Sequence, residues 1–538
     1  MFWADKIAEE IKNEYRDKIV LQADSGQAKG EAIIIRDEKT ASGKIHVGSL
    51  RGVAIHGIIS EVLNEQNIKN KFLYEINDFD VMDGLPVYLD RETFLPHMGK
   101  PLCNVPSPDG KAKNYAEYFG QEFIKIIESL GFKPEFYRSS DLYKTGEFNE
   151  AIKTALENAD KIREIYKKIS GADKEKGWLP ISMVCQNCGK IGTTKAISFD
   201  DKEVEYICEE NYVEWAKGCG YRGKISPFDG NAKLPWKVEW AAKFSVLDVS
   251  VEGAGKDHST KGGAREVADT ISREVFKRKP PFDIKYEFFQ VGGKKMSSSK
   301  GAGSSAKEIA DSLPPEIFRF LLLYKEPRQV IDFIPDGDTI PILYDNYDKM
   351  AEDYFTDRKG DYKRIFYLSH TPQQRAEIIK RFLPRFSQIA FLAQMPHINI
   401  SQEVEKIKAG KLSDEDESEV EYRTRYALKW LSVYAPEDYK FELQTKEIPL
   451  KAKELGEKQK QALKIILDYV SSKDVLDGQE LHSKLHEIKS DLKIEPKELF
   501  SAIYLSFLGK VSGPKAGWFL SVLDKKFLEK RLNEVVSS

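Results

Sequence analysis

The chain has 538 residues, too many for one ordinary hydrophobic core, so we expect several domains. Apolar residues make up 41% and charged residues 31%, which excludes a disordered chain, and the net charge of -3 gives no global sign of a nucleic-acid binder. No apolar run approaches the roughly 18 residues that cross a bilayer, and the charged start MFWADKIAEEIKNEYRDK is unlike a signal peptide, so we expect a cytoplasmic protein with no membrane partner.

Strand-like and helix-like segments alternate through the first part of the chain, which predicts a parallel sheet. A strand is expected at 31–35 (EAIII), followed by a helix at 49–66, where apolar side chains recur at helical spacing. The alternation continues with a strand at 70–80, a helix at 115–131 and a strand at 134–140.

Residues 171–232 interrupt this alternation, and their Gly-rich, Cys-rich composition predicts an inserted small β module. Clustered cysteines in a cytosolic chain more often hold a metal than form disulfides. A CxxC pair can share one tetrahedral ion, whereas the second pair is spaced more widely and no histidine lies between the four. We predict an all-Cys structural zinc site, with reduced structural cysteines as the alternative. Its ligands would be Cys185, Cys188, Cys208 and Cys219.

Strands are expected to resume at 244–253 and 285–293, and the pattern turns helical from about Pro314. The acidic stretch 411–421 is predicted to be a solvated lead-in to a helix, and Trp430 to be a core residue. Helices are predicted at 314–324, 422–434 and 459–470, and the stretch 513–532 is expected to punctuate the last helices.

The segment KTASGKIHVGSLRG, residues 39–52, joins the first strand to the first helix of the sheet. A helix start at the carboxyl end of a parallel strand offers free N–H groups and the positive end of the helix dipole. Gly43 and Gly48 let a ligand approach the backbone, and His46 adds a donor, so the turn suits a nucleotide. A Gly-rich structural turn explains the stretch equally well.

A second segment, GGKKMSSSKG at 292–301, places three lysines and three serines between glycines. Lys295 and Lys300 would neutralise the charge that develops on a leaving pyrophosphate. Alone, the segment fits a basic surface loop. Together with HVGS about 250 residues upstream, it indicates an enzyme that uses a nucleotide.

These two segments resemble signatures of a known family. HVGS (46–49) is similar to the HIGH motif of class I aminoacyl-tRNA synthetases, and KMSSS (295–299) to their KMSKS motif. Further blocks, in matching order from about residue 30 to 530, resemble the class I lysyl-tRNA synthetase family. They are TASGKIHVG, KPLCNVPSPDG, LPWKVEWAAKF, GAGKDHSTKGGARE, YEFFQVGGKKMSSSKG and GPKAGWFL.

The resemblance implies an α/β protein with a Rossmann-type parallel-sheet catalytic domain at 1–315, carrying the 171–232 zinc insertion. A stem-contact connector at 316–370 and an all-α anticodon-binding domain at 371–538 would follow. The implied reaction activates L-lysine with ATP and Mg²⁺, releases pyrophosphate, and transfers lysine to the 3′ end of tRNA(Lys). We expect a monomer.

The resemblance also implies site residues. The catalytic residues would be His46, Gly48, Ser49, Lys295, Ser298 and Lys300. ATP would contact Ser42, Gly43, His46, Gly48, Asp257, Lys295, Met296, Ser297 and Ser299. Lysine would contact Thr40, Asp78, Asp80, Trp236, His258 and Tyr286.

This chain departs from the family pattern at two positions. Ser298 stands where the motif has Lys, so the second basic charge would come from Lys300. Glu38 stands where relatives tend to have Gly. We interpret Glu38 and Asp37 as solvated loop charges, with contact of either one with the lysine ammonium as the alternative.

Three other functions fit parts of this pattern. Glutamyl and cysteinyl synthetases share both signatures, but GKDHSTKGG and KVEWAAKF favour lysine. A catalytically degenerate synthetase-like tRNA-binding protein would not need intact His46, Gly48, Lys295 and Lys300. A small nucleotidyltransferase would not need the long helical region that follows KMSSS.

Overall fold

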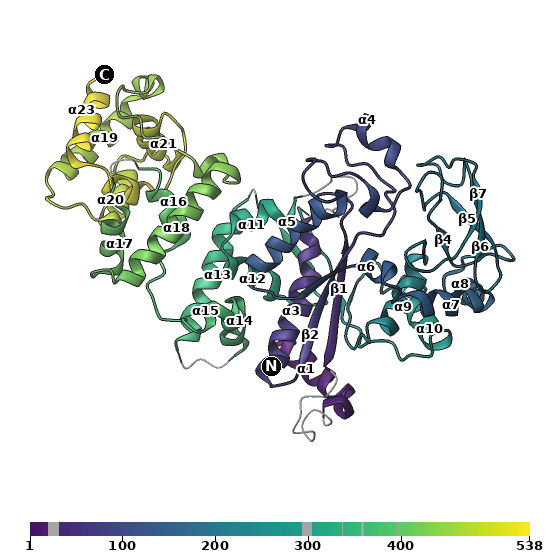
Figure 1. The fold of residues 1–538 in the computed structure, drawn as a ribbon. Coiled ribbons are helices and arrows are strands. Elements are labelled where there is room, and N and C mark those ends of the chain that lie inside the picture. The colour runs from purple at the N-terminus through teal and green to yellow at the C-terminus, as the bar shows by residue number, and fades with distance from the viewer. Residues whose placement is uncertain (20–31, 293–303, 336, 357–359, 396–397) are drawn as a thin grey trace. The chain divides into compact units, whose positions relative to one another are not determined.

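The computed structural model describes residues 1–19, 32–292, 304–335, 337–356, 360–395 and 398–538 (Figure 1). The chain divides into two compact units, the first made of 1–333 and 350–378 and the second of 334–349 and 379–538. No helix in these described ranges has the length and apolar character needed to cross a membrane.

A parallel sheet forms the centre of the first unit. Strand β1 (Ile33–Thr40) pairs with β2 (Asn70–Asn77), which pairs with β3 (Glu135–Arg138). On its other side β1 pairs at Ile35 with Val251, which pairs in turn with Phe282. The sheet continues from there as β9 (Ala254–Gly255) beside β10 (Lys285–Tyr286).

All of these pairings are parallel, and the strand order changes direction at β1. In open α/β sheets, ligands bind outside the carboxyl ends of the strands at such a topological switch point. The fold therefore places the site where β1 and β9 end.

Helices cover both faces of the sheet. The almost fully buried α3 (Leu50–Glu65) and the amphipathic α5 (Tyr115–Ser129) pack on one face, and α9 (Trp236–Val246) lies over the other. The other helices of this unit are α1 (Trp3–Glu14), α4 (Arg91–Phe94), α6 (Ser139–Lys144), α7 (Asn149–Glu157), α8 (Ala159–Ser170), α10 (Ala264–Glu274), α11 (Ala306–Ser312), α12 (Pro315–Leu323), α14 (Asp361–Ser369) and α15 (Pro372–Arg375).

The helices predicted at 49–66 and 115–131 and the strands at 70–80 and 134–140 are confirmed within a few residues of their ends. The strand predicted at 244–253 is wrong in its first part, because α9 continues through Val246 and buries Phe244 in the core.

The strand predicted at 285–293 is two short strands with different partners. β10 pairs with β9, and β11 (Phe289–Val291) pairs with β12 (Ile331–Phe333).

The β character predicted for 171–232 is confirmed. β4 (Ser182–Met183) pairs with β8 (Ala232–Lys233), and β5 (Thr194–Phe199), β6 (Val204–Cys208) and β7 (Arg222–Ile225) form an antiparallel sheet.

The second unit is helical. The acidic stretch at 411–421 is mostly the start of α18 (Asp414–Val433) rather than a lead-in, because Ser413 and Asp416 form a capping box there. Trp430 is fully buried, which confirms its predicted place in the core. The other helices are α16 (Phe386–Leu392), α17 (Ile400–Lys408), α19 (Glu457–Ser471), α20 (Gly478–Asp491), α21 (Pro496–Leu508), α22 (Ala516–Ser521) and α23 (Lys525–Ser537), and α13 (Thr339–Tyr354) spans both units.

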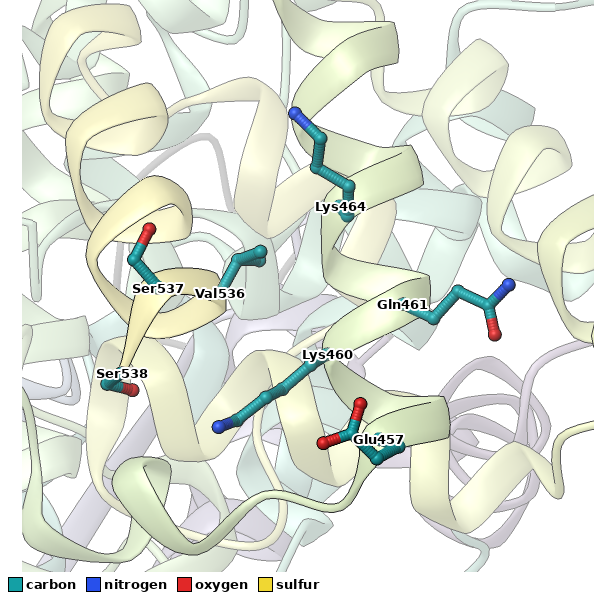
Figure 2. A pocket seen from close by; sticks show the side chains of 7 residues that line it. All are labelled: Glu457, Lys460, Gln461, Lys464, Val536, Ser537 and Ser538. Atoms are coloured by element: carbon teal, nitrogen blue, oxygen red, sulfur yellow. The ribbon is translucent and has the colours of Figure 1, made fainter.

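A pocket of about 500 Å³ lies in the second unit, between α19 and the end of α23 (Figure 2). No residue predicted to bind ATP, lysine or metal lines it. Its lining is Glu457, Lys460, Gln461, Lys464, Val536, Ser537 and Ser538.

Candidate active site and metal centre

The signature turn leads from β1 into α3. His46 precedes a 3₁₀ turn at Val47–Ser49, which continues directly into α3. The turn is fixed to residues just beyond 303: Val47 donates its N–H to the Ser304 carbonyl at 3.2 Å, and Ala306 donates to the Ile45 carbonyl at 2.9 Å. The residues that follow the second signature segment thus meet the first signature at this turn.

The catalytic and nucleotide-binding predictions within the second signature lie outside the described residues. These are Lys295, Met296, Ser297, Ser298, Ser299 and Lys300.

Helix α5 contacts the start of the turn. The hydroxyl of buried Tyr115 donates to the Ser42 carbonyl at 2.9 Å, next to Gly43. Gly48 and Ser49 are half-buried at the entrance to α3. On the far strand, a Cβ at Gly255 would lie 3.1 Å from Asp257 Oδ1 and 3.7 Å from the Tyr286 ring, so this glycine admits both side chains.

Two predicted lysine-binding residues meet at the carboxyl ends of β1 and β2. The Thr40 hydroxyl donates to Asp80 Oδ2 at 2.6 Å, and Lys233 Nζ lies 3.0 Å from Asp80 Oδ1. Lys233 belongs to β8, so the inserted module contributes a cation to this edge of the sheet.

Asp78 lies close by, but its carboxylate already accepts several hydrogen bonds. It is 4% exposed, and its carboxylate accepts hydrogen bonds from the Ser140 N–H at 2.8 Å and the Ser140 hydroxyl at 2.6 Å. A further bond comes from the Ser139 hydroxyl at 3.1 Å. Asp78 thus caps the start of α6, and its contact with lysine stays a prediction.

An aromatic cluster forms beside this edge. The ring centroid of His258 lies 5.6 Å from that of Trp236 and 6.0 Å from that of Trp240. Trp236 is 47% exposed, so it is not a core residue. Sequence reasoning missed Trp240, although its spacing of four residues from Trp236 on a helix placed the two side by side.

A network of charged side chains lies on the α9 face of the sheet, and all of its members but the half-buried Glu38 are buried. It comprises Arg36, Glu38, Glu75, Lys243 and Glu252. Arg36 contacts Glu252 at 2.8 Å and Glu75 at 2.6 Å, and it also pairs with Glu38. Lys243 contacts Glu75 at 2.7 Å and Glu38 at 3.0 Å. We call these five residues the ion network.

The electrostatics of this cluster favour the charged forms of Glu38 and Lys243. Burial raises the pKa of Glu38, but Lys243 and Arg36 lower it more, so the net shift is downward. Burial lowers the pKa of Lys243, but Glu239, Glu38 and Glu75 raise it well above its usual value. Charged residues at strand positions that were expected to be buried could have revealed this network. Sequence reasoning did not use that signal.

The four cysteines of the inserted module converge. Their sulfur atoms all lie within 4.8 Å of one another, with Cys185 to Cys219 at 3.6 Å and Cys188 to Cys208 at 3.7 Å. None forms a disulfide. Four sulfurs at about 2.3 Å from a tetrahedral zinc ion stand roughly 3.8 Å apart, so the geometry fits that ion.

Residues 209–218 explain the wide spacing of the second cysteine pair. They form an excursion that returns to its start: a Cβ at Gly218 would lie 2.1 Å from the Glu209 carbonyl oxygen. The Cys219 N–H then donates to Cys208 Sγ at 3.4 Å.

This excursion contacts the segment after β2. A Cβ at Gly192 would lie 2.6 Å from the Trp215 ring and 2.8 Å from Val81, so Gly192 fits between these two side chains. Ile191 donates its N–H to the Gly99 carbonyl at 2.7 Å, and the segment ends where Leu102 donates to the Asp80 carbonyl at 2.8 Å.

Comparisons with known proteins find similar chains. A lysine--tRNA ligase of Methanosarcina barkeri (strain Fusaro / DSM 804) is 34% identical over 557 aligned positions, covering 99% of this chain and 97% of the relative. A lysine--tRNA ligase of Methanocaldococcus jannaschii is 32% identical, covering 99% of each chain. A solved glutamate tRNA ligase from Elizabethkingia meningosepticum aligns at 12% identity with a TM-score of 0.41, covering 94% of this chain and all of its own, which is too distant to carry an argument.

Residues 1–372 match the profile of the family described as tRNA synthetases class I (K), which is more than half of the chain. The signature turn, its position at the switch point of the sheet and this match lead to one conclusion. The chain belongs to the class I tRNA synthetase (K) family.

Proposed function

We propose that the protein is a lysine–tRNA ligase that activates L-lysine with ATP and esterifies tRNA(Lys). A lysine carboxylate oxygen attacks the α-phosphorus of ATP, and the bond to pyrophosphate breaks. A hydroxyl of the terminal ribose of tRNA then attacks the lysyl carbonyl, and AMP leaves. The observation that carries this proposal is the signature turn at the carboxyl end of β1, in a chain alike over its full length to lysine–tRNA ligases.

The nucleotide would lie over the start of α3. Ser42, Gly43, His46 and Gly48 would contact its phosphates and base, where the helix dipole favours anions, and Asp257 would hold the ribose. Mg²⁺ would accompany ATP as a counter-ion of its phosphates. Ser49 and the second-signature residues would stabilise the transition state, with Lys295 and Lys300 neutralising pyrophosphate.

Lysine would occupy the edge where β1, β2, β9 and β10 end. The Trp236 and His258 rings would pack against its methylenes, with Thr40 and Asp80 at the same edge. Two residues of β1, Glu38 and Asp37, are the candidates to accept its side-chain ammonium.

Zn²⁺ would be held by Cys185, Cys188, Cys208 and Cys219 and would stabilise the inserted module without taking part in the reaction. The helical second unit would bind the anticodon of tRNA(Lys). We expect a monomer that acts in the cytoplasm.

The test is lysine-dependent ATP–pyrophosphate exchange with the full chain, with and without unmodified lysine tRNA, and with glutamate and cysteine as competing substrates. We expect exchange with lysine and not with glutamate or cysteine, and we expect the His46→Ala variant to lose this exchange. Exchange with glutamate or cysteine instead would reassign the amino acid. Retained tRNA binding with no exchange for any amino acid would favour the catalytically degenerate tRNA-binding protein.

A further inference from the structure

Adjacent residues of β1 face opposite sides of the sheet, which separates Glu38 from Asp37. Glu38 faces α9, where its Oε2 atom already accepts from both Arg36 and Lys243. Two buried cations therefore satisfy Glu38 before any substrate arrives. Asp37 faces α3, away from these cations.

Asp37 is buried, at 8% exposure, so it is not a solvated loop charge. Its Oδ1 accepts the Glu38 N–H at 2.8 Å. Among the residues that the structure describes, its one ion-pair contact is with His56, whose Nδ1 lies 3.4 Å from Asp37 Oδ2. Lys39, the next residue on this face, forms no ion pair with it there. A buried carboxylate without a full cation partner is costly, and a cationic ligand would relieve that cost.

Gly52 brings this carboxylate together with a tyrosine hydroxyl. A Cβ at Gly52 would lie 2.6 Å from Asp37 Oδ2 and 3.0 Å from Tyr286 Oη, so both oxygens border the same point on α3. Burial, followed by the charges of Asp37 and Asp257, raises the pKa of Tyr286 well above its usual value. The hydroxyl therefore stays protonated and offers its lone pairs to a donor.

His56 lies next to Asp37. Burial lowers the pKa of His56 and Asp37 raises it more, so the net shift is upward. The Gly253 N–H nevertheless donates to His56 Nε2 at 2.8 Å, which requires that nitrogen to be unprotonated. The hydrogen-bond geometry assigns a neutral ring with its hydrogen on Nδ1, directed at the Gly52 carbonyl at 2.8 Å and near Asp37. A neutral ring orients Asp37 and leaves its charge uncompensated.

We propose that Asp37 is the specificity-determining residue that accepts the side-chain ammonium of lysine, with Tyr286 Oη as the second acceptor and His56 as a positioning residue. The inference rests on the proposed function and selects between the two acceptors that the sequence left open. Gly52 is the counterpart on α3, because any larger residue would occupy the position of the Asp37 carboxylate.

The experiment compares Asp37→Asn with the wild-type chain in tRNA charging, using lysine and 2-amino-6-hydroxyhexanoic acid, which replaces the ammonium by a neutral hydroxyl. Asp201→Asn, at an exposed turn, is the matched control. We expect KM for lysine to rise by about 30-fold or more in Asp37→Asn, because a buried charge pair loses one partner. The KM for ATP and the kcat/KM for the hydroxy analogue should stay within about threefold of wild type, since neither depends on this charge pair.

Equal losses for both amino acids, or lysine discrimination unchanged from wild type, would overturn the assignment. If Asp37→Asn does not fold, the Tyr286→Phe variant tests the proposal instead. We expect its KM for lysine to rise about tenfold and its KM for the analogue to stay unchanged. An unchanged KM for lysine would overturn the proposal. A wild-type chain that charges no tRNA with lysine refutes the proposed function itself, whereas a working enzyme indifferent to Asp37→Asn refutes this inference alone.

Discussion

Replacing Lys243 by Met tests the ion network directly. Lys243 is 1% exposed and contacts Glu75 at 2.7 Å and Glu38 at 3.0 Å. Methionine has a similar volume, so the change removes a charge rather than opening a cavity. Glu75, itself fully buried, keeps Arg36 as its remaining cation. Removing one partner of a buried pair costs about 3–5 kcal/mol, because the other charge stays buried and uncompensated.

Urea unfolding followed by tryptophan fluorescence measures this cost. At a slope of roughly 3 kcal/mol per molar urea, the midpoint should fall by about 1 M or more. Trp240 donates to Glu252 at 2.6 Å and so reports from within the network. Lys224→Met is the control, since its pair with Asp200 is half exposed on both sides and should leave the midpoint unchanged. If Lys243→Met unfolds at the wild-type urea concentration, the reasoning about the network is wrong.

Three further outcomes are expected. Cys188→Ser should lower bound zinc, measured by elemental analysis, whereas Cys103→Ser should retain it; equal zinc in both would remove the metal assignment. His46→Ala should reduce pyrophosphate exchange by about 100-fold or more without shifting the unfolding midpoint, and a small effect would place the phosphate contacts elsewhere. Burial raises the pKa of Asp416, but its ion pair with Lys408 and a backbone N–H lower it to about 2. A carboxyl with a folded pKa below its unfolded value stabilises the fold above about pH 4 and loses this effect toward pH 2, so the stability gap between wild type and Asp416→Asn should close over that window in urea titrations.

Sequence periodicity was sufficient to locate α3 and β2. It was not sufficient for β1, which was predicted at 31–35 but continues through the charged residues 36–40. It failed at Phe244 and Val246, since a short apolar run fits a buried helix and a buried strand alike.

The charged members of the site were harder to predict for another reason. Alternation places Arg36 and Glu38 on one face of β1 and Asp37 on the other, but it cannot say which face Lys243 joins, because Lys243 lies more than 200 residues away. The convergence of Cys208 and Cys219 likewise depends on an excursion whose closure no spacing rule describes.

The contact between the inserted module and the segment after β2 has a consequence for the cell. The excursion and Gly192 lie against Val81, and β8 of the same module supplies the lysine that pairs with Asp80. If the module holds zinc as proposed, loss of the ion would weaken the contact between Lys233 and Asp80, while the bond from Thr40 of β1 to Asp80 would remain. If the chain charges tRNA as proposed, scarcity of zinc in the growth medium would then slow the supply of charged tRNA, and with it translation.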